Sequence, residues 1–125
     1  MKNIGNYVDG FVMVVSKKKL ADYKEMATMG SKLWMKHGAL DYKECVIEDP
    51  KPKHVLMPFG KMANAKPGEL VVFSYILFKS RAHRDAVNAK VMKDPTMNDP
   101  KYANKPMPFD MNRMAYGGFS VIVSS

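Results

Sequence analysis

Residues 70–78 form the segment that most constrains the fold of this chain. The apolar or aromatic residues of one strand parity are Leu70, Val72, Ile76 and Phe78, and those of the other are Val71, Phe73, Tyr75 and Leu77. Only Ser74 interrupts the pattern. A strand that is apolar on both faces belongs in the centre of a sheet, with material covering each side. We therefore predict a central strand at this position.

Two helices and three further strands are predicted around this central strand. Helical spacing of apolar residues follows Ser16, a candidate N-cap, and stops before Gly38. A second helix is predicted for residues 81–93, between the N-cap Ser80 and an Asp-Pro stop signal. The other strands are predicted at residues 7–15, 39–47 and 116–124. The order β-α-β-β-α-β indicates an α+β, ferredoxin-like fold with an antiparallel four-stranded sheet.

The two-sided central strand also bears on assembly. Two helices can cover only one face of a four-stranded sheet, so the other apolar face needs a second layer. A partner subunit is the simplest source of that layer. We therefore expect a homodimer in which two sheets face each other.

The two ends of the chain carry similar strands. Residues 8–16 and 116–124 share Gly, Phe, Val and Ser in register. In a ferredoxin-like sheet the first and last strands are neighbours, so we expect the two copies to pair antiparallel. Asp9 stands where the second copy has Gly117. This change in charge makes Asp9 a candidate site residue.

The whole chain, residues 1–125, is predicted to be a single domain. A proline-rich stretch at about residues 49–68 predicts an extended arm or loop, and residues 95–113 predict an irregular segment. Hydrophobic content of 46% and charged content of 26% are typical of a soluble globular protein. No apolar run approaches the roughly 20 residues of a membrane helix. The single cysteine and the absence of a signal-peptide pattern favour a cytoplasmic location.

The net charge of +8 allows an anionic partner, but the lysines are dispersed along the chain. No module signature of a nucleic-acid binder is present, so a solvated basic surface is the preferred interpretation. The chain also contains 12 methionines. Flexible Met side chains fill irregular cores, which is the favoured interpretation, and they also line pockets or dimer interfaces.

Metal and cofactor chemistry finds little support in the sequence. The histidines and Cys45 lie far apart, without the spacing of a metal site. Glycine-rich phosphate-binding loops are absent as well. We therefore expect neither a metal nor a cofactor. Cys45 is interpreted as a small buried apolar residue rather than a nucleophile.

Four polar residues in or beside strands are the candidate ligand-binding residues: Asp9, Glu44, Ser74 and Arg113. A carboxylate on a buried sheet must be paired, protonated or facing a wet cavity. Arg113, or Arg81 and Arg84 on the second helix, could pair with either carboxylate. A structural ion pair and a polar lining for a small-molecule cavity are the two interpretations. No catalytic residue is assigned.

Two Met-Pro-Phe triplets, at residues 57–59 and 107–109, recur in the irregular parts of the chain. Proline stiffens the backbone, and the apolar neighbours need burial. Loop anchoring is slightly favoured over a role as a lid or dimer contact.

Several motifs together resemble the YbaA-like bacterial family of uncharacterised proteins. They are Tyr7-Val8-Asp9-Gly10-Phe11, Phe73-Ser74-Tyr75, and the segments 84–95 and 107–119. The resemblance runs from about residue 7 to residue 123. The family often has Trp where this chain has Tyr75, and residues 51–57 match poorly. The resemblance implies a dimeric α/β barrel, an architecture shared with cofactor-free monooxygenases and heme-binding enzymes.

We therefore expect a homodimer that binds a small, largely apolar ligand between its sheets, with the four polar residues orienting the ligand. The alternative is a cofactor-independent monooxygenase or isomerase-like enzyme in which Asp9 or Glu44 acts as acid or base. A third and weaker alternative, based on the +8 charge, is RNA binding.

Overall fold

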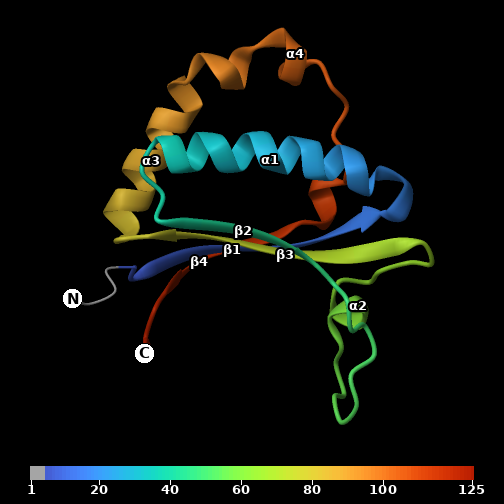
Figure 1. Ribbon diagram of the computed structural model, residues 1–125. Helices are drawn as coiled ribbons and strands as arrows, with labels where there is room; N and C mark the ends of the chain where they lie inside the picture. The colour runs from blue at the N-terminus through green and yellow to red at the C-terminus, as the bar shows by residue number, and fades with distance from the viewer. Residues whose placement is uncertain (1–4) are drawn as a thin grey trace.

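The computed structural model describes residues 5–125 and contains one antiparallel four-stranded sheet. Its strands are β1 (Tyr7–Ser16), β2 (Asp41–Val46), β3 (Glu69–Phe78) and β4 (Ala115–Ser120). They lie in the order β2-β3-β1-β4, with β3 and β1 in the centre (Figure 1). The ferredoxin-like α+β fold and the central position of residues 70–78 are therefore confirmed.

The similar strands at the two ends pair as predicted. β1 and β4 run antiparallel, with Gly10 opposite Gly117 and Asp9 opposite Gly118. The ring of Phe119 lies over Gly10 and Gly117, where an added Cβ would be 3.2 and 3.4 Å from the ring. The predicted length of the last strand was wrong, because β4 ends at Ser120 rather than continuing to residue 124.

Both long helices begin and end close to the predicted positions. A short 3-10 turn, η1 (Lys17–Lys19), precedes α1 (Leu20–Lys36), and the Ser16 side chain accepts from the Lys18 amide as its cap. Ser80 caps α3 (Arg81–Lys93) in the same way, through the His83 amide. Gly38 has φ of 115°, a conformation that favours glycine and ends α1.

Helices α1 and α3 cover one face of the sheet (Figure 1). Every second side chain of a strand points to this face. Asp9 of β1 and its partner Ile76 of β3 both do so. The core divides into two clusters. One includes Ile76, Phe78, Leu33, Ala39, Val87 and Val91, and the other includes Met13, Val15, Val72, Tyr23 and Ala27. Full burial of a Val, Leu, Ile, Phe or Met side chain stabilises the fold by about 1.5–3 kcal/mol.

The opposite face of the sheet, here called the open face, carries no helix among the described residues apart from the short α2 (Phe59–Met62) near one end. Its central pairs are Val8 with Leu77 and Val12 with Phe73. Phe73 and Phe119 are 44% and 59% exposed. The central strand is thus apolar on both faces, as predicted, and one of those faces is uncovered in the single chain.

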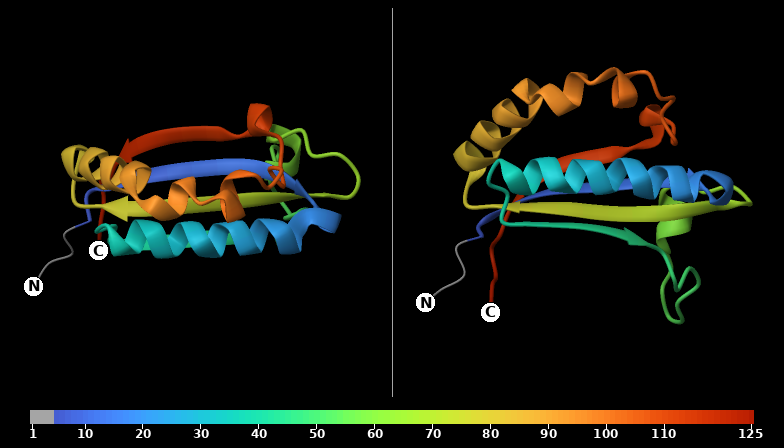
Figure 2. Two further views of the ribbon diagram at one scale, coloured as in Figure 1. Left: turned by 90° about the horizontal axis from the view of Figure 1, so that it is seen from above. Right: turned by 45° about the horizontal axis from the view of Figure 1, so that its top comes forward.

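The predicted arm projects beyond the open face and contains α2 (Figures 1 and 2). Residues 95–114, here called the covering segment, are less irregular than expected. They contain η2 (Pro95–Asn98), α4 (Pro100–Ala103) and η3 (Met111–Arg113). The covering segment runs beside α1, above the central strands (Figure 2). It therefore lies on the same side of the sheet as the two long helices.

Asp94 anchors the start of the covering segment. Its buried carboxylate lies 2.7 Å from His37 Nε2 and 3.0 Å from Lys36 Nζ at the end of α1. The same side chain accepts from the Thr96 amide and so caps η2. The hydrogen bond from His37 lowers the pKa of Asp94, and the bonds from Thr96 and Lys36 act in the same direction.

No helix within residues 5–125 is long and apolar enough to cross a membrane.

Candidate functional site

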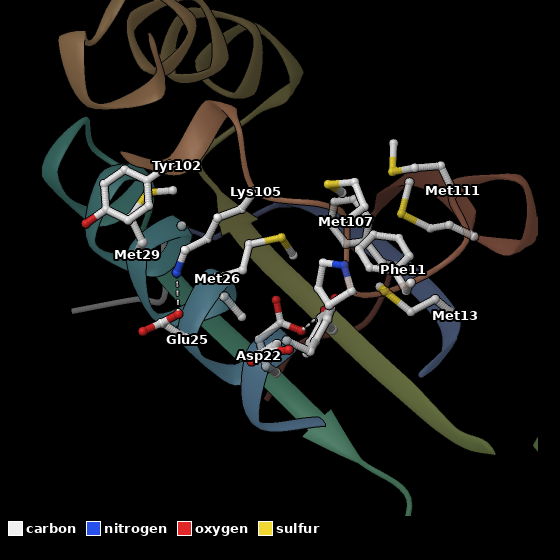
Figure 3. Close-up of a pocket in the computed structure, with 18 of the residues that line it drawn as sticks. Phe11, Met13, Asp22, Glu25, Met26, Met29, Tyr102, Lys105, Met107 and Met111 are labelled. Carbon is white, nitrogen blue, oxygen red and sulfur yellow. Dashed lines mark hydrogen bonds and ion pairs between the residues drawn. The ribbon is translucent and has the colours of Figure 1, made fainter. Parts of the chain in front are cut away.

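A cavity of about 730 Å³ lies between α1, the helix-covered face of the sheet and the covering segment. Figure 3 shows side chains from all three converging on it. Among the described residues, seven methionines line this cavity: Met13, Met26, Met29, Met97, Met107, Met111 and Met114. Unbranched thioether side chains adapt to ligands of different shape. Five of these seven methionines also lie in or pack against the two core clusters, so they both fill the core and line the cavity.

One face of α1 supplies a wall of the cavity. Tyr23, Met26, Ala27, Gly30 and Trp34 recur at helical spacing and all line it. Gly30 faces the Tyr42 hydroxyl, from which an added Cβ would lie at the contact distance of 3.4 Å. The wall is largely apolar.

Glu44 and two tyrosines form the polar part of the cavity. The Tyr23 hydroxyl donates to Glu44 Oε1 at 2.6 Å, and the Tyr42 hydroxyl donates to Oε2 at 2.8 Å. Burial raises the pKa of both phenols, and the adjacent Glu44 raises both further. Both phenols therefore remain protonated hydrogen-bond donors at neutral pH.

The position of this polar group follows from strand register. Glu44 pairs with Ser74, and Ser74 pairs with Phe11, so these residues form one row across the helix-covered face. The next rows, through Val72 and Ile76, belong to the two separate core clusters. The row through Ser74 therefore divides the core and leaves room for the cavity. Within residues 5–125, Glu44 forms no ion pair.

Asp9 lies on the same face but does not line the cavity. It is 2% exposed and pairs with Arg84 of α3 at 2.6 Å, while the Tyr116 hydroxyl donates to it at 3.1 Å. The Arg84 guanidinium also lies 5.2 Å from the centre of the Tyr7 ring. Burial raises the pKa of Asp9, and the charge of Arg84 opposes that effect. Asp9 thus joins β1 to α3 and β4, which is the structural interpretation of this residue.

Arg113 also takes part in a separate ion pair. Its guanidinium donates to both carboxylate oxygens of Glu69, at 2.7 and 2.9 Å, and to the backbone oxygen of Asn64 at 2.8 Å. Hydrogen bonds from Arg113 lower the pKa of Glu69 to about 2. Arg113 therefore joins the end of the covering segment to β3 and the arm, and it does not contact the cavity.

Of the four predicted residues, the structure brings only Glu44 and Ser74 to one cavity. We expected that cavity between the sheets of two subunits. Asp9, Glu44 and Ser74 instead point to the helix-covered face, because they share strand parity with the buried Ile76 and Val72. The cavity found here therefore lies within one chain, on the opposite side of the sheet.

Sequence reasoning did not identify Tyr23 and Tyr42 as residues of this candidate site. A usable signal existed for Tyr42, which precedes Glu44 by two residues and so shares its face. The contact of Tyr23 with Glu44 joins a helix to a strand 21 residues away, and only packing could show it. Cys45 is exposed on the open face, so our interpretation of it as a buried residue was wrong for the single chain.

A cluster of three or more His, Cys, Asp or Glu side chains suited to a metal ion is not found within residues 5–125. The polar chemistry of the cavity comes instead from one carboxylate, two phenols and a serine hydroxyl. These groups can accept and donate hydrogen bonds, and the carboxylate can hold a proton or a positive charge.

The fold and the cavity define a ferredoxin-like α+β protein with an internal, largely apolar pocket. The chain belongs to the family described as "Protein of unknown function (DUF1428)", whose sequence model matches residues 6–111. It is similar to "Uncharacterized protein YbaA" of Escherichia coli strain K12 and to the protein of the same name from Shigella flexneri. In both comparisons the identity is 43% over 117 residues, covering 94% of this chain and 97% of the relative. The resemblance to the YbaA-like family is confirmed.

Proposed function

We propose that this protein is a homodimer and that each subunit binds a small, largely apolar ligand in its own cavity. The observation that carries the ligand proposal is the Glu44–Tyr23–Tyr42 group inside the methionine-lined cavity of about 730 Å³. Binding sites for small molecules are commonly concave, mostly apolar and about 300–1,000 Å³ in volume, with a few convergent polar groups. This cavity has each of those properties.

The apolar and polar parts of the cavity would have different roles in binding. The thioethers and rings would contact the body of the ligand, where flexible Met side chains tolerate several shapes. Glu44 would bind a hydrogen-bond donor of the ligand and so orient it. Tyr23 and Tyr42 hold the two oxygens of that carboxylate in place.

The open face supports the dimer. Val8, Val12, Phe73, Leu77 and Phe119 form a continuous apolar surface across β3, β1 and β4. Water contact with such a surface is unfavourable, and a second copy related by a two-fold axis would cover it with an identical surface. In this arrangement the two cavities lie on the outer sides of the paired sheets.

Ligand binding can be tested by thermal shift with a panel of neutral aromatic and aliphatic compounds. Trp34, the single tryptophan of the chain, lines the cavity, so its fluorescence provides a second signal. We expect compounds that raise the melting temperature also to change Trp34 emission. Gly30→Leu should narrow the cavity beside Tyr42 and weaken both effects. Gly60→Leu, at a position with open space around it, is the control. If no compound stabilises the protein, or if Gly30→Leu binds as well as the wild type, the cavity is not the site.

A second candidate function is catalysis by Glu44 as a general base. Two features favour it: the carboxylate has no cationic partner within residues 5–125, and it lies beside two phenols that stay protonated. Such a group could remove a proton from a C–H or O–H of the ligand, and the phenols could donate to the oxyanion that forms. This chemistry begins both a cofactor-independent oxygenation and an isomerisation.

Oxygen consumption with quinol substrates, and deuterium exchange at the carbon next to a ketone, distinguish catalysis from binding. We expect an enzyme to lose turnover in Glu44→Gln while still binding its ligand. Binding by the wild type without turnover or exchange would leave a ligand-binding protein.

A further inference from the structure

We propose that the ligand of this cavity is a cation, namely an apolar amine whose ammonium group binds Glu44. This inference rests on the proposed ligand-binding function and adds the chemical class of the ligand. Three independent features of the cavity support it: the unbalanced charge of Glu44, the charges at the cavity mouth and the aromatic lining.

The first feature is that the Glu44 carboxylate has hydrogen-bond donors but no positively charged partner among the described residues. Its two oxygens each accept a hydrogen bond from a neutral phenol, Tyr23 on one side and Tyr42 on the other. A carboxylate accepts through both oxygens only, so two phenolic donors fit the ionised form. Among the described residues, no Lys, Arg or His forms an ion pair with it. A charge in an apolar cavity is costly unless it is paired, and an ammonium ion of the ligand would supply the partner.

The lone pairs of Glu44 allow this contact. Each carboxylate oxygen can accept about two hydrogen bonds, and the tyrosines use one on each oxygen. An ammonium group could therefore bind without displacing either phenol. Charge-assisted hydrogen bonds of this kind are roughly twice as strong as neutral ones.

The second feature is the charge around the cavity. Among the described residues, Asp22, Glu25 and Glu44 line the cavity together with one basic residue, Lys105, whose Nζ lies 2.8 Å from Glu25. The charge of Lys101, which is not in the lining, also acts on Glu25. Figure 3 shows this ion pair between α1 and the covering segment, with Asp22 nearby. The chain as a whole carries +8, so the cavity is locally acidic on a basic protein. Such a local field attracts cations and disfavours anions.

The third feature is the lining. Tyr23 and Phe109 pack edge to face, with ring centres 5.7 Å apart, and Trp34 and Phe11 add further rings. Aromatic faces attract organic cations, and this attraction strengthens where water is excluded. Thioethers and rings suit an organic ammonium ion better than a hydrated metal ion, which needs several oxygen or nitrogen ligands.

Three naphthalene probes with different polar groups at carbon 1 test the inference. 1-Naphthylmethylamine is a cation at pH 7, 1-naphthalenemethanol is neutral and 1-naphthoate is an anion. Their affinities would be measured by isothermal titration calorimetry on the full chain. We expect the amine to bind about tenfold more tightly than the alcohol, because a charge-assisted hydrogen bond replaces a neutral one, and the naphthoate to bind most weakly.

Substitutions test whether Glu44 causes the preference for the amine over the alcohol. Glu44→Gln should bring the amine and the alcohol to within about twofold of each other, because the substitution removes the charge and keeps the shape. Glu48→Gln, at an exposed position outside the cavity lining, is the control and should keep the preference for the amine. Circular dichroism and melting temperature would establish that each variant is folded.

The outcomes separate this inference from the function on which it rests. Equal binding of the amine and alcohol, or tighter binding of the naphthoate, would overturn the cationic ligand and leave the ligand-binding proposal standing. An amine preference that survives Glu44→Gln would also overturn it. Failure of all three probes to bind the wild type would count against both.

Discussion

The Tyr23 hydroxyl donates a 2.6 Å hydrogen bond to Oε1 of Glu44 and thereby joins α1 to β2 inside the cavity. Tyr23 is 5% exposed, so its hydroxyl has little access to water as an alternative partner. The same contact stabilises the packing of α1 on the sheet and holds the only carboxylate on the cavity side of β2. One hydrogen bond therefore links the stability of the fold to the proposed site.

Removal of that hydroxyl is expected to destabilise the protein. Tyr23→Phe leaves Glu44 with one phenolic donor, and loss of a hydrogen bond to a charged group lowers the free energy of unfolding by about 1.5–3 kcal/mol. Urea denaturation measures the change. Tyr102→Phe is the matched control, because Tyr102 also lines the cavity but does not bond to Glu44. Equal stabilities of the two variants would contradict the assigned contact.

The Asp9–Arg84 pair should contribute strongly to stability. Arg84→Ala would leave the Asp9 carboxylate buried without its cation, which costs about 3 kcal/mol or more. Arg81→Ala, on the exposed surface of the same helix, should change the free energy of unfolding by less than about 0.5 kcal/mol. A comparable effect of the two substitutions would refute a structural role for the pair.

Acid should weaken the attachment of the covering segment. The Arg113 hydrogen bonds lower the pKa of Glu69 from 4.5 to about 2, so the folded state favours its ionised form. The resulting stabilisation is present above pH 4.5 and is lost as the pH falls towards about 2. We expect the melting temperature of Glu69→Gln to fall less steeply than that of the wild type across this range. Glu48→Gln, at an exposed position, should follow the wild-type curve.

Gly30→Ala should raise stability and weaken ligand binding. Alanine in a helix is about 1 kcal/mol more favourable than glycine, and the new Cβ would lie at ordinary contact distances, 3.4 Å from the Tyr42 hydroxyl and 4.0 Å from the Trp34 ring. The methyl group would reduce the cavity beside Glu44. Thermal melts and calorimetry measure the two effects.

Gly118→Ala should lower the stability of the protein. Its Cβ would overlap the Tyr7 side chain, at 2.8 Å from Cζ, so β4 or the ring would have to move. We expect a loss of about 1–3 kcal/mol. A Gly118→Ala variant as stable as the wild type would show that the Tyr7 ring moves aside at little cost.

The homodimer predicts a specific solution mass. Light scattering should give about twice the 14.1 kDa of the chain. Phe73→Glu would place a charge in the centre of the open face and should yield a monomer. Met92→Glu, at an exposed position on α3, should leave the mass unchanged. A wild-type mass near 14.1 kDa would exclude the dimer.

Much of the fold could be predicted from local signals. The caps Ser16 and Ser80 and the stop at Gly38 are short-range hydrogen-bond and backbone effects, so the helix boundaries follow from adjacent residues. The two-sided apolar pattern of β3 placed it beside β1 in the centre of the sheet. The end of β4 could not be predicted from these signals, because the apolar pattern continues past Ser120 while the pairing with β1 does not.

The order of residues shows which side chains need partners, but only packing between distant parts of the chain selects those partners. Residues 70–78 require cover on both faces wherever the strand lies, because apolar side chains of both parities avoid water. By contrast, Asp9 pairs with Arg84, Arg113 with Glu69, and Glu44 with two tyrosines. These choices depend on strand register and on the path of the covering segment, which are set by packing between distant parts of the chain.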